Sequence, residues 1–87
     1  MATLNGLLDA YKAENELLTD RALAAQLGIS FTALANYRAG VRKLPDRAVV
    51  QLADATGHSL HHVMALANLA LNELGQDDVE FWADYLD

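Results

Sequence analysis

The sequence predicts an all-α fold, with five helices in one compact domain and an extra short helix at the C-terminus. Apolar residues recur at the three- and four-residue spacing of one helical face, and Ser, Thr or Gly stands at most segment ends. One proline and five glycines in 87 residues leave little room for a turn-rich β fold. The hydrophobic fraction of 53% suffices for one modest core, so residues 1–87 are expected to form a single domain.

The first two helices are expected to begin after threonine caps. Thr3 can cap a helix that ends between Glu14 and Glu16, and Thr19 can cap a second helix that stops at Gly28. The apolar residues that share a face in these two segments are Leu4, Leu7, Leu8 and Tyr11, followed by Leu23, Ala24 and Leu27.

The third and fourth helices are separated by a basic loop. Ser30 can cap a helix over residues 31–39, after which residues 41–44 are expected to form the loop. Pro45 is suited to a helix start, because a backbone N–H at that position would have no partner within the helix. Gly57 can end this fourth helix.

The last two helices fill the C-terminal third of the chain. Ser59 can cap a fifth helix that is expected to run to about Leu74. Asp77 and Glu80 have the spacing of a capping box, which predicts a short final helix that reaches Leu86.

The net charge of −6 hides an asymmetry along the chain. Residues 20–50 hold five basic and two acidic residues, or +3, whereas the rest of the chain carries −9. An acidic protein as a whole disfavours nucleic acid as a partner, because contacts with phosphates dominate such binding. A basic patch on an otherwise acidic protein can still bind nucleic acid, because its local charge attracts phosphates.

Several functional classes find no support in the sequence. The absence of cysteine removes disulfides, thiolate nucleophiles and cysteine-ligated zinc, and it fits a reducing compartment. No signal-peptide pattern opens the chain and no apolar stretch reaches ~18 residues, so we expect a cytoplasmic protein without a membrane span. No Ser-His-Asp arrangement, glycine-rich phosphate loop or isolated carboxylate pair points to an enzyme or to a cofactor.

Three histidines, at positions 58, 61 and 62, resemble a metal site only superficially. His58 and His62 lie on either side of the cap at Ser59 and so do not share a regular helical face. Asp54 is the only neighbouring carboxylate, and no cysteine completes a ligand set. We therefore expect a surface cluster and no bound metal.

Residues 20–40 have the spacing of a helix-turn-helix unit. Ala24 is small where the two helices approach, and Gly28 supplies the left-handed turn residue. Ile29, Leu34 and Tyr37 are apolar where the second helix must lean on the first. The positions left on the outward face are Ser30, Phe31, Thr32, Ala35, Asn36 and Ala39.

The run LAAQLGISFTALANYRAG, the loop VRKLP and the segment RAVVQLADATGHSLHHVMAL resemble the lambda-repressor/Cro (Xre) helix-turn-helix family. The resemblance covers residues 4–70 and implies a compact five-helix DNA-binding domain that acts as a dimeric transcriptional repressor. It implies that 31–39 is the recognition helix, with base contacts from its first residues and phosphate contacts from the flanking loop. More loosely, the chain is similar to small prophage and filamentous-phage repressors.

Four residues are candidates for contacts with DNA bases. Asn36 has the donor and acceptor that adenine N6 and N7 require. Ser30 and Thr32 can contact bases or phosphates, and Ser30 also serves as a cap. Phe31 either packs on a thymine methyl group or folds back onto Ile29 as part of the core.

Six residues are candidates for contacts with phosphates. Four of the six basic residues lie within residues 38–47, which a merely solubilising loop does not explain well. The family often has Glu at the position of Arg38, paired with an Arg on the first helix. Here Arg38 either pairs in reverse with Glu14 or Glu16, or contacts a phosphate. The complete set of phosphate candidates is Arg42, Lys43, Arg47 and Arg38, with Arg21 and Gln26 as weaker members.

The C-terminal third, residues 59–87, is the expected dimerisation region. A surface helix needs one apolar stripe, and the fifth helix has more than one. Three of the six aromatic residues lie in the last seven positions, and so much aromatic area is rarely left in water. It either packs within its own chain or forms a two-fold interface. The expected interface residues are Leu66, Leu69, Phe81, Trp82, Tyr85 and Leu86.

Two functions are therefore expected from the sequence. The first is a repressor that binds a palindromic operator on double-stranded DNA as a homodimer. The alternative is an antitoxin-like interaction module, in which the aromatic C-terminus binds a partner protein.

Overall fold

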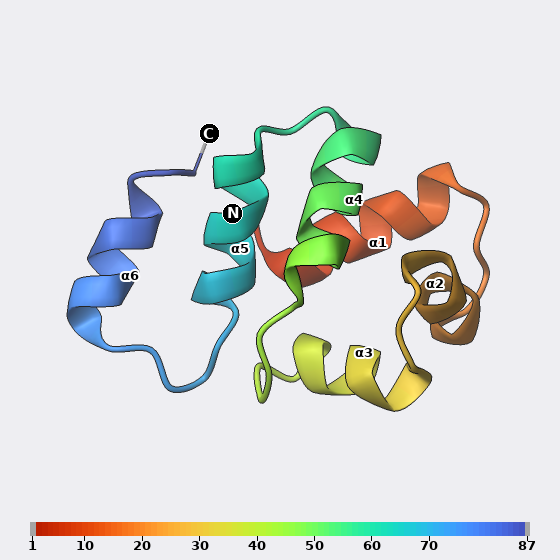
Figure 1. Ribbon diagram of the computed structural model, residues 1–87, viewed down its shortest axis with the longest axis horizontal. Coiled ribbons are helices and arrows are strands. Elements are labelled where there is room, and N and C mark those ends of the chain that lie inside the picture. Colours follow the sequence, from red (N-terminus) through yellow and green to blue (C-terminus); the bar gives the residue numbers. More distant parts are fainter. Residues whose placement is uncertain (1, 87) are drawn as a thin grey trace.

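Residues 2–86 are described by the computed structural model, which contains six helices and no strand over this range (Figure 1). Its radius of gyration of 12.3 Å is that of a compact domain of this length. The helices are α1 (Leu4–Glu14), α2 (Asp20–Leu27), α3 (Phe31–Arg38), α4 (Asp46–Thr56), α5 (Leu60–Leu69) and α6 (Gln76–Ala83).

Side-chain caps begin four of the six helices, as the sequence predicts. The hydroxyls of Thr3, Thr19, Ser30 and Ser59 each accept a hydrogen bond from the backbone N–H three residues later. The starts of α1, α2, α3 and α5 are therefore fixed by local chemistry. Pro45 occupies the N-cap of α4 without a side-chain bond.

The last two helices depart from their predicted bounds. α5 ends at Leu69 and does not reach Leu74. The chain leaves the helix because Asn72 bonds to the end of α3: its N–H donates to the Gly40 carbonyl at 2.9 Å, and its Nδ2 donates to the Ala39 carbonyl at 2.9 Å.

α6 begins two residues earlier than the expected capping box implies, and it stops at Ala83. Gly75 is the N-cap and makes no side-chain bond, so Asp77 lies inside the first turn and the predicted capping role of Asp77 is wrong. A carboxylate in the first turn still interacts favourably with the helix dipole.

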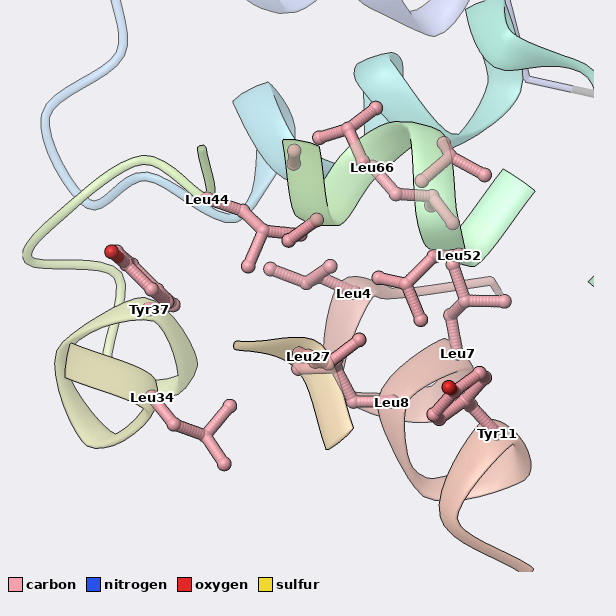
Figure 2. Packing of buried hydrophobic residues seen from close by; sticks show 14 of the residues in the cluster. Leu4, Leu7, Leu8, Tyr11, Leu27, Leu34, Tyr37, Leu44, Leu52 and Leu66 are labelled. Atoms are coloured by element: carbon pink, nitrogen blue, oxygen red, sulfur yellow. The ribbon is translucent and has the colours of Figure 1, made fainter. Parts of the chain in front are cut away.

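The hydrophobic core is complete before α6 begins. Its buried members come from α1 to α5 and from Leu44 in the loop, and Ala67 is the last of them along the chain. Figure 2 shows Leu4 and Leu8 of α1 converging with Leu27 of α2 and Leu52 of α4. Because α6 contributes no buried residue, it packs on the outside of the core that α1 to α5 form.

The position of α6 defines the surroundings of the predicted interface residues. α6 lies beside α5 at the end of the molecule opposite α2 (Figure 1). Leu66 of α5 is only 3% exposed and belongs to the intrachain core, although it also reaches the groove described next, so its role in a dimer interface stays a prediction. Leu69 and Leu86 line an apolar groove of about 550 Å³ between α6, the end of α5 and the start of α1.

No helix among residues 2–86 is both long enough and apolar enough to cross a membrane.

Candidate nucleic-acid interface

The turn between α2 and α3 is built as the sequence predicts. Gly28 adopts φ 71°, and the N–H of Ile29 closes the end of α2 on the Ala24 carbonyl at 3.0 Å. Leu34 and Tyr37 are buried on the inner face of α3. One face of this short helix is therefore held by the body, and the opposite face is presented outward.

The predicted base-contact residues lie together on that outward face. Ser30, Phe31 and Thr32 are exposed at the start of α3, and Asn36 is half-buried about one turn further on. Ser30 Oγ accepts from the N–H of Ala33 at 3.0 Å, which confirms its capping role. The small exposed side chains of Ala35 and Ala39 leave the face flat, which suits close approach to another surface.

Phe31 does not join the core, so that alternative is excluded. Phe31 is 41% exposed and lies outside the buried cluster, whereas Ile29 packs against that cluster. The guanidinium carbon of Arg21, on α2, lies 4.3 Å from the ring centroid of Phe31. Two residues predicted to contact DNA through separate elements are thus in contact with each other.

The basic loop is held against the end of α3. The N–H groups of Val41 and Arg42 both donate to the Asn36 carbonyl, at 3.0 and 3.4 Å. Leu44 is 1% exposed and anchors the other end of the loop in the core. Arg42 and Lys43 are therefore exposed in a short, tethered segment beside the exposed face of α3. The sequence indicated the charge of this loop but not its apolar anchor.

Two further candidates flank α3. Arg47 is exposed in the first turn of α4, directly after the loop. Gln26 is exposed near the end of α2, where its backbone carbonyl accepts from Gln51 Nε2 at 2.8 Å. Gln51 was not predicted to matter, and its bond ties α4 to the end of α2.

Arg38 is bound to carboxylates, which is one of the two alternatives that the sequence left open. Its NH2 group lies 2.8 Å from Asp9 Oδ1 and donates to Asp20 Oδ1 at 3.1 Å. Its Nε lies 2.9 Å from Asp20 Oδ2, at an angle unsuited to a hydrogen bond. The predicted partners Glu14 and Glu16 are wrong. The acidic residues that bind Arg38 are Asp9, in the middle of α1, and Asp20, the first residue of α2.

Asn5 completes this network around Arg38. Its Oδ1 accepts from Arg38 NH1 and its Nδ2 donates to the Arg38 carbonyl, both at 3.1 Å. The Arg38 side chain is 18% exposed, and its guanidinium joins α3 to α1 and α2 through bonds to protein groups. We therefore omit Arg38 from the phosphate contacts proposed below.

The same network shifts two pKa values. Burial alone would raise the pKa of Asp20, but hydrogen bonds from Arg38 and Lys12 outweigh it and hold that pKa below its ordinary value. Burial alone would lower the pKa of Arg38, yet its hydrogen bonds to Asp20 and Asp9 raise it. Both groups are charged at neutral pH.

Acid is expected to weaken this network through Asp20. Because the pKa of Asp20 is lower in the folded chain, the unfolded chain takes up the proton first as pH falls, and stability drops below about pH 4.

Asp20→Asn should lose about 1–2 kcal/mol of unfolding free energy at neutral pH and show a shallower loss in acid. Urea titrations between pH 7 and pH 3 measure this. Asp54→Asn, at an exposed carboxylate that forms no ion pair within residues 2–86, is the control. Equal pH profiles for the two variants would contradict the assignment.

The histidines are arranged differently from the predicted surface cluster. His62 is 3% exposed, and its ring lies 4.6 Å from that of His58. His61 is exposed and faces Tyr85 across 5.5 Å between ring centroids. No group of three His, Cys, Asp or Glu residues suited to a metal ion occurs in the described part of the chain.

The aromatic residues of the tail form a surface cluster. The ring centroids of Phe81 and Trp82 are 5.0 Å apart, and those of Phe81 and Tyr85 are 5.3 Å apart. Phe81 is 53% and Tyr85 39% exposed, while Trp82 is half-buried. These rings pack on one another and still leave much of their area in water.

Comparisons of this chain with protein-family models, with curated proteins and with solved structures found no match.

Proposed function

We propose that this chain is a sequence-specific DNA-binding transcriptional repressor of the lambda-repressor/Cro kind, in which α2 and α3 form the helix-turn-helix unit and α3 is the recognition helix. The observation that carries the proposal is the distribution of free positive charge. Among residues 2–86, Lys12 and Arg38 are the bases held by acidic residues. The other four, Arg21, Arg42, Lys43 and Arg47, form no ion pair there and flank α3.

The exposed face of α3 fits the major groove, which is wide enough to admit one helix. Ser30, Thr32 and Asn36 would face the base edges, and the Asn36 amide suits adenine. Arg42, Lys43 and Arg47, with Gln26, would contact the phosphates beside the groove and fix the helix on the duplex. The acidic α6 lies beside α5, at the end of the molecule opposite α2 (Figure 1), and it approaches α3 only near Arg38, at the far end of α3 from Ser30 and Thr32.

Dimer formation is part of the proposal, because one short helix reads few base pairs and a single module buries only ~600–1,000 Å². Two-fold related copies would present two copies of α3 to a palindromic operator. The exposed rings of Phe81 and Tyr85, with Trp82 in contact with them, would supply apolar surface for this contact, and Leu69 and Leu86 in the groove would add to it.

The same aromatic cluster favours a second candidate function. A chain that stays monomeric while 53% of Phe81 is exposed would offer this surface to a different protein, as an antitoxin offers one to its toxin. Sedimentation of the isolated chain separates the two cases, because the repressor proposal expects a dimer and the interaction module a monomer.

Neutralising the loop is expected to weaken binding to every DNA sequence alike. Arg42→Ala or Lys43→Ala should each lower the slope of log affinity against log salt by about 0.9, since each removes one phosphate contact. Fluorescence anisotropy with random-sequence and selected duplexes at several salt concentrations measures this. Gln76→Glu makes the same one-unit charge change on the exposed start of α6 and should leave the slope unchanged. If Arg42→Ala, Lys43→Ala and Gln76→Glu all keep the wild-type slope of log affinity against log salt, the loop does not contact DNA.

Removing the Asn36 amide is expected to change specificity. Asn36→Ala should relax the preference at one base pair in each half-site, at a cost of about 1–3 kcal/mol. Binding to random DNA and the salt slope should stay as in the wild type, because no phosphate contact is lost. A variant that selects the wild-type consensus would remove Asn36 from the base contacts.

A further inference from the structure

Arg21 occupies a position that its own helix does not favour. It lies in the first turn of α2, where the helix dipole disfavours a cation. Its neighbour Asp20 is already bound to Arg38 and Lys12, so no carboxylate among the described residues takes up this charge. What holds Arg21 is the ring of Phe31, with the guanidinium carbon 4.3 Å from the ring centroid.

The stacking of Arg21 on Phe31 leaves both side chains partly exposed to solvent and able to contact another molecule. An arginine within about 6 Å of a ring centroid is attracted to the ring, and its N–H groups remain directed outward in the guanidinium plane. Both side chains are exposed, and Phe31 keeps 41% of its area in solvent. The contact therefore fixes a cation at the edge of the recognition face without neutralising it.

We propose that Phe31 is a positioning residue, whose ring holds Arg21 beside the start of α3, and that the Arg21 guanidinium binds a DNA phosphate there. This inference rests on the proposed function. A phosphate suits the guanidinium, because its oxygens accept the two parallel N–H bonds of the planar fork. A base is the poorer partner, since the first helix of a helix-turn-helix unit crosses the backbone while the second enters the groove.

The proposal changes the role that the sequence suggested for Phe31. With the guanidinium over the ring, packing on a thymine methyl group is no longer its function. Two substitutions separate these roles. Phe31→Tyr keeps the aromatic face for Arg21, whereas Phe31→Leu keeps apolar bulk for a methyl group and removes the π-system.

The test measures affinity and salt slope for Arg21→Ala, Phe31→Leu, Phe31→Tyr and the double variant Arg21→Ala/Phe31→Leu. Arg21→Ala should lower the slope by about 0.9. Phe31→Leu should weaken binding about two- to fivefold and leave the selected consensus unchanged, while Phe31→Tyr binds as the wild type. The double variant should bind no more weakly than Arg21→Ala alone, since both changes remove one contact.

Three results would overturn the inference: additive losses in the double variant, wild-type binding by Phe31→Leu, or a shifted consensus at one base pair. A chain that binds no DNA overturns the proposed function and the phosphate role together. The Arg21–Phe31 contact has its own readout without DNA, an upfield ring-current shift of the Arg21 side-chain protons that Phe31→Leu abolishes. If Arg21→Ala leaves the salt slope unchanged while the wild-type chain shows the ring-current shift, the contact between Arg21 and Phe31 stands and the phosphate contact is wrong.

Discussion

Deletion of residues 77–87 is expected to yield a folded monomer that has lost about 100-fold or more of its affinity for the operator. The chain stays folded because every buried core residue lies between Leu4 and Ala67. It becomes monomeric because the exposed rings of Phe81 and Tyr85 leave with the deleted segment. The affinity falls because two linked recognition helices gain 10²–10⁴ over one, through effective concentration alone.

Binding to random DNA should respond differently to this deletion. The removed segment contains five acidic residues and no basic one, so its loss takes negative charge away from the chain. Affinity for random sequences should therefore be maintained or rise, while operator affinity falls. Sedimentation and anisotropy on the same samples measure both effects.

A double variant separates the loss of the rings from the loss of the acidic residues. Phe81→Ala/Tyr85→Ala keeps every charge and should also sediment as a monomer, whereas Leu18→Ala removes an apolar side chain that is 91% exposed elsewhere and should remain dimeric. If the deleted chain still forms dimers and binds its operator normally, the interface lies on another face.

Gly40→Ala is expected to cost about 2–4 kcal/mol of unfolding free energy. Gly40 adopts φ 77°, a left-handed conformation that costs any other residue about 1–2 kcal/mol. An added Cβ would also lie 2.5 Å from the backbone carbonyl oxygen of Ala70, which cannot easily move aside, and 2.6 Å from Asn72 Oδ1, whose side chain is held by its bond to Ala39. The substitution therefore forces apart the end of α3 and the segment that follows α5.

Gly57→Ala is the matched control, because Gly57 has φ 74° but no atom within 4 Å of the added Cβ. It should lose only the conformational cost of about 1–2 kcal/mol. Urea unfolding of the two variants gives the difference, which measures the close packing at Gly40 alone. Equal losses would show that the contact between Gly40 and residues 70–72 does not constrain the fold.

The starts of α1, α2, α3 and α5 were predictable from the sequence because they depend on near neighbours. Thr3, Thr19, Ser30 and Ser59 bond to the N–H groups three residues on, and no distant contact is needed to recognise them. The turn at Gly28 was predictable for the same reason, since the left-handed conformation is a local demand.

The end of α5 was not predictable, because a distant contact decides it. Residues 70–74 are Ala, Leu, Asn, Glu and Leu, which read as a continuing helix. The chain instead leaves the helix where Asn72 bonds to Ala39 and Gly40. The apolar residues of α5 form a wide stripe whose spacing does not show which side faces the core, so the burial of Leu66 could not be predicted from the sequence.

The candidate interface shows the same division. The cluster of basic residues and the exposed positions of α3 followed from composition and helical spacing. The actual partners of Arg38, Asp9 and Asp20, depend on how α1 and α2 meet α3, which spacing along the chain does not encode. The stacking of Arg21 on Phe31 likewise joins two helices across the turn.

Selection of bound sequences from a random duplex pool, at one salt concentration near ~0.15 M, tests the central claim most directly. The proposed function predicts a palindromic consensus whose half-sites are one helical turn apart, about 34–36 Å, because two copies of α3 must face the same side of the duplex. A pool that shows no enrichment after repeated rounds, while the chain remains folded, would contradict sequence-specific binding.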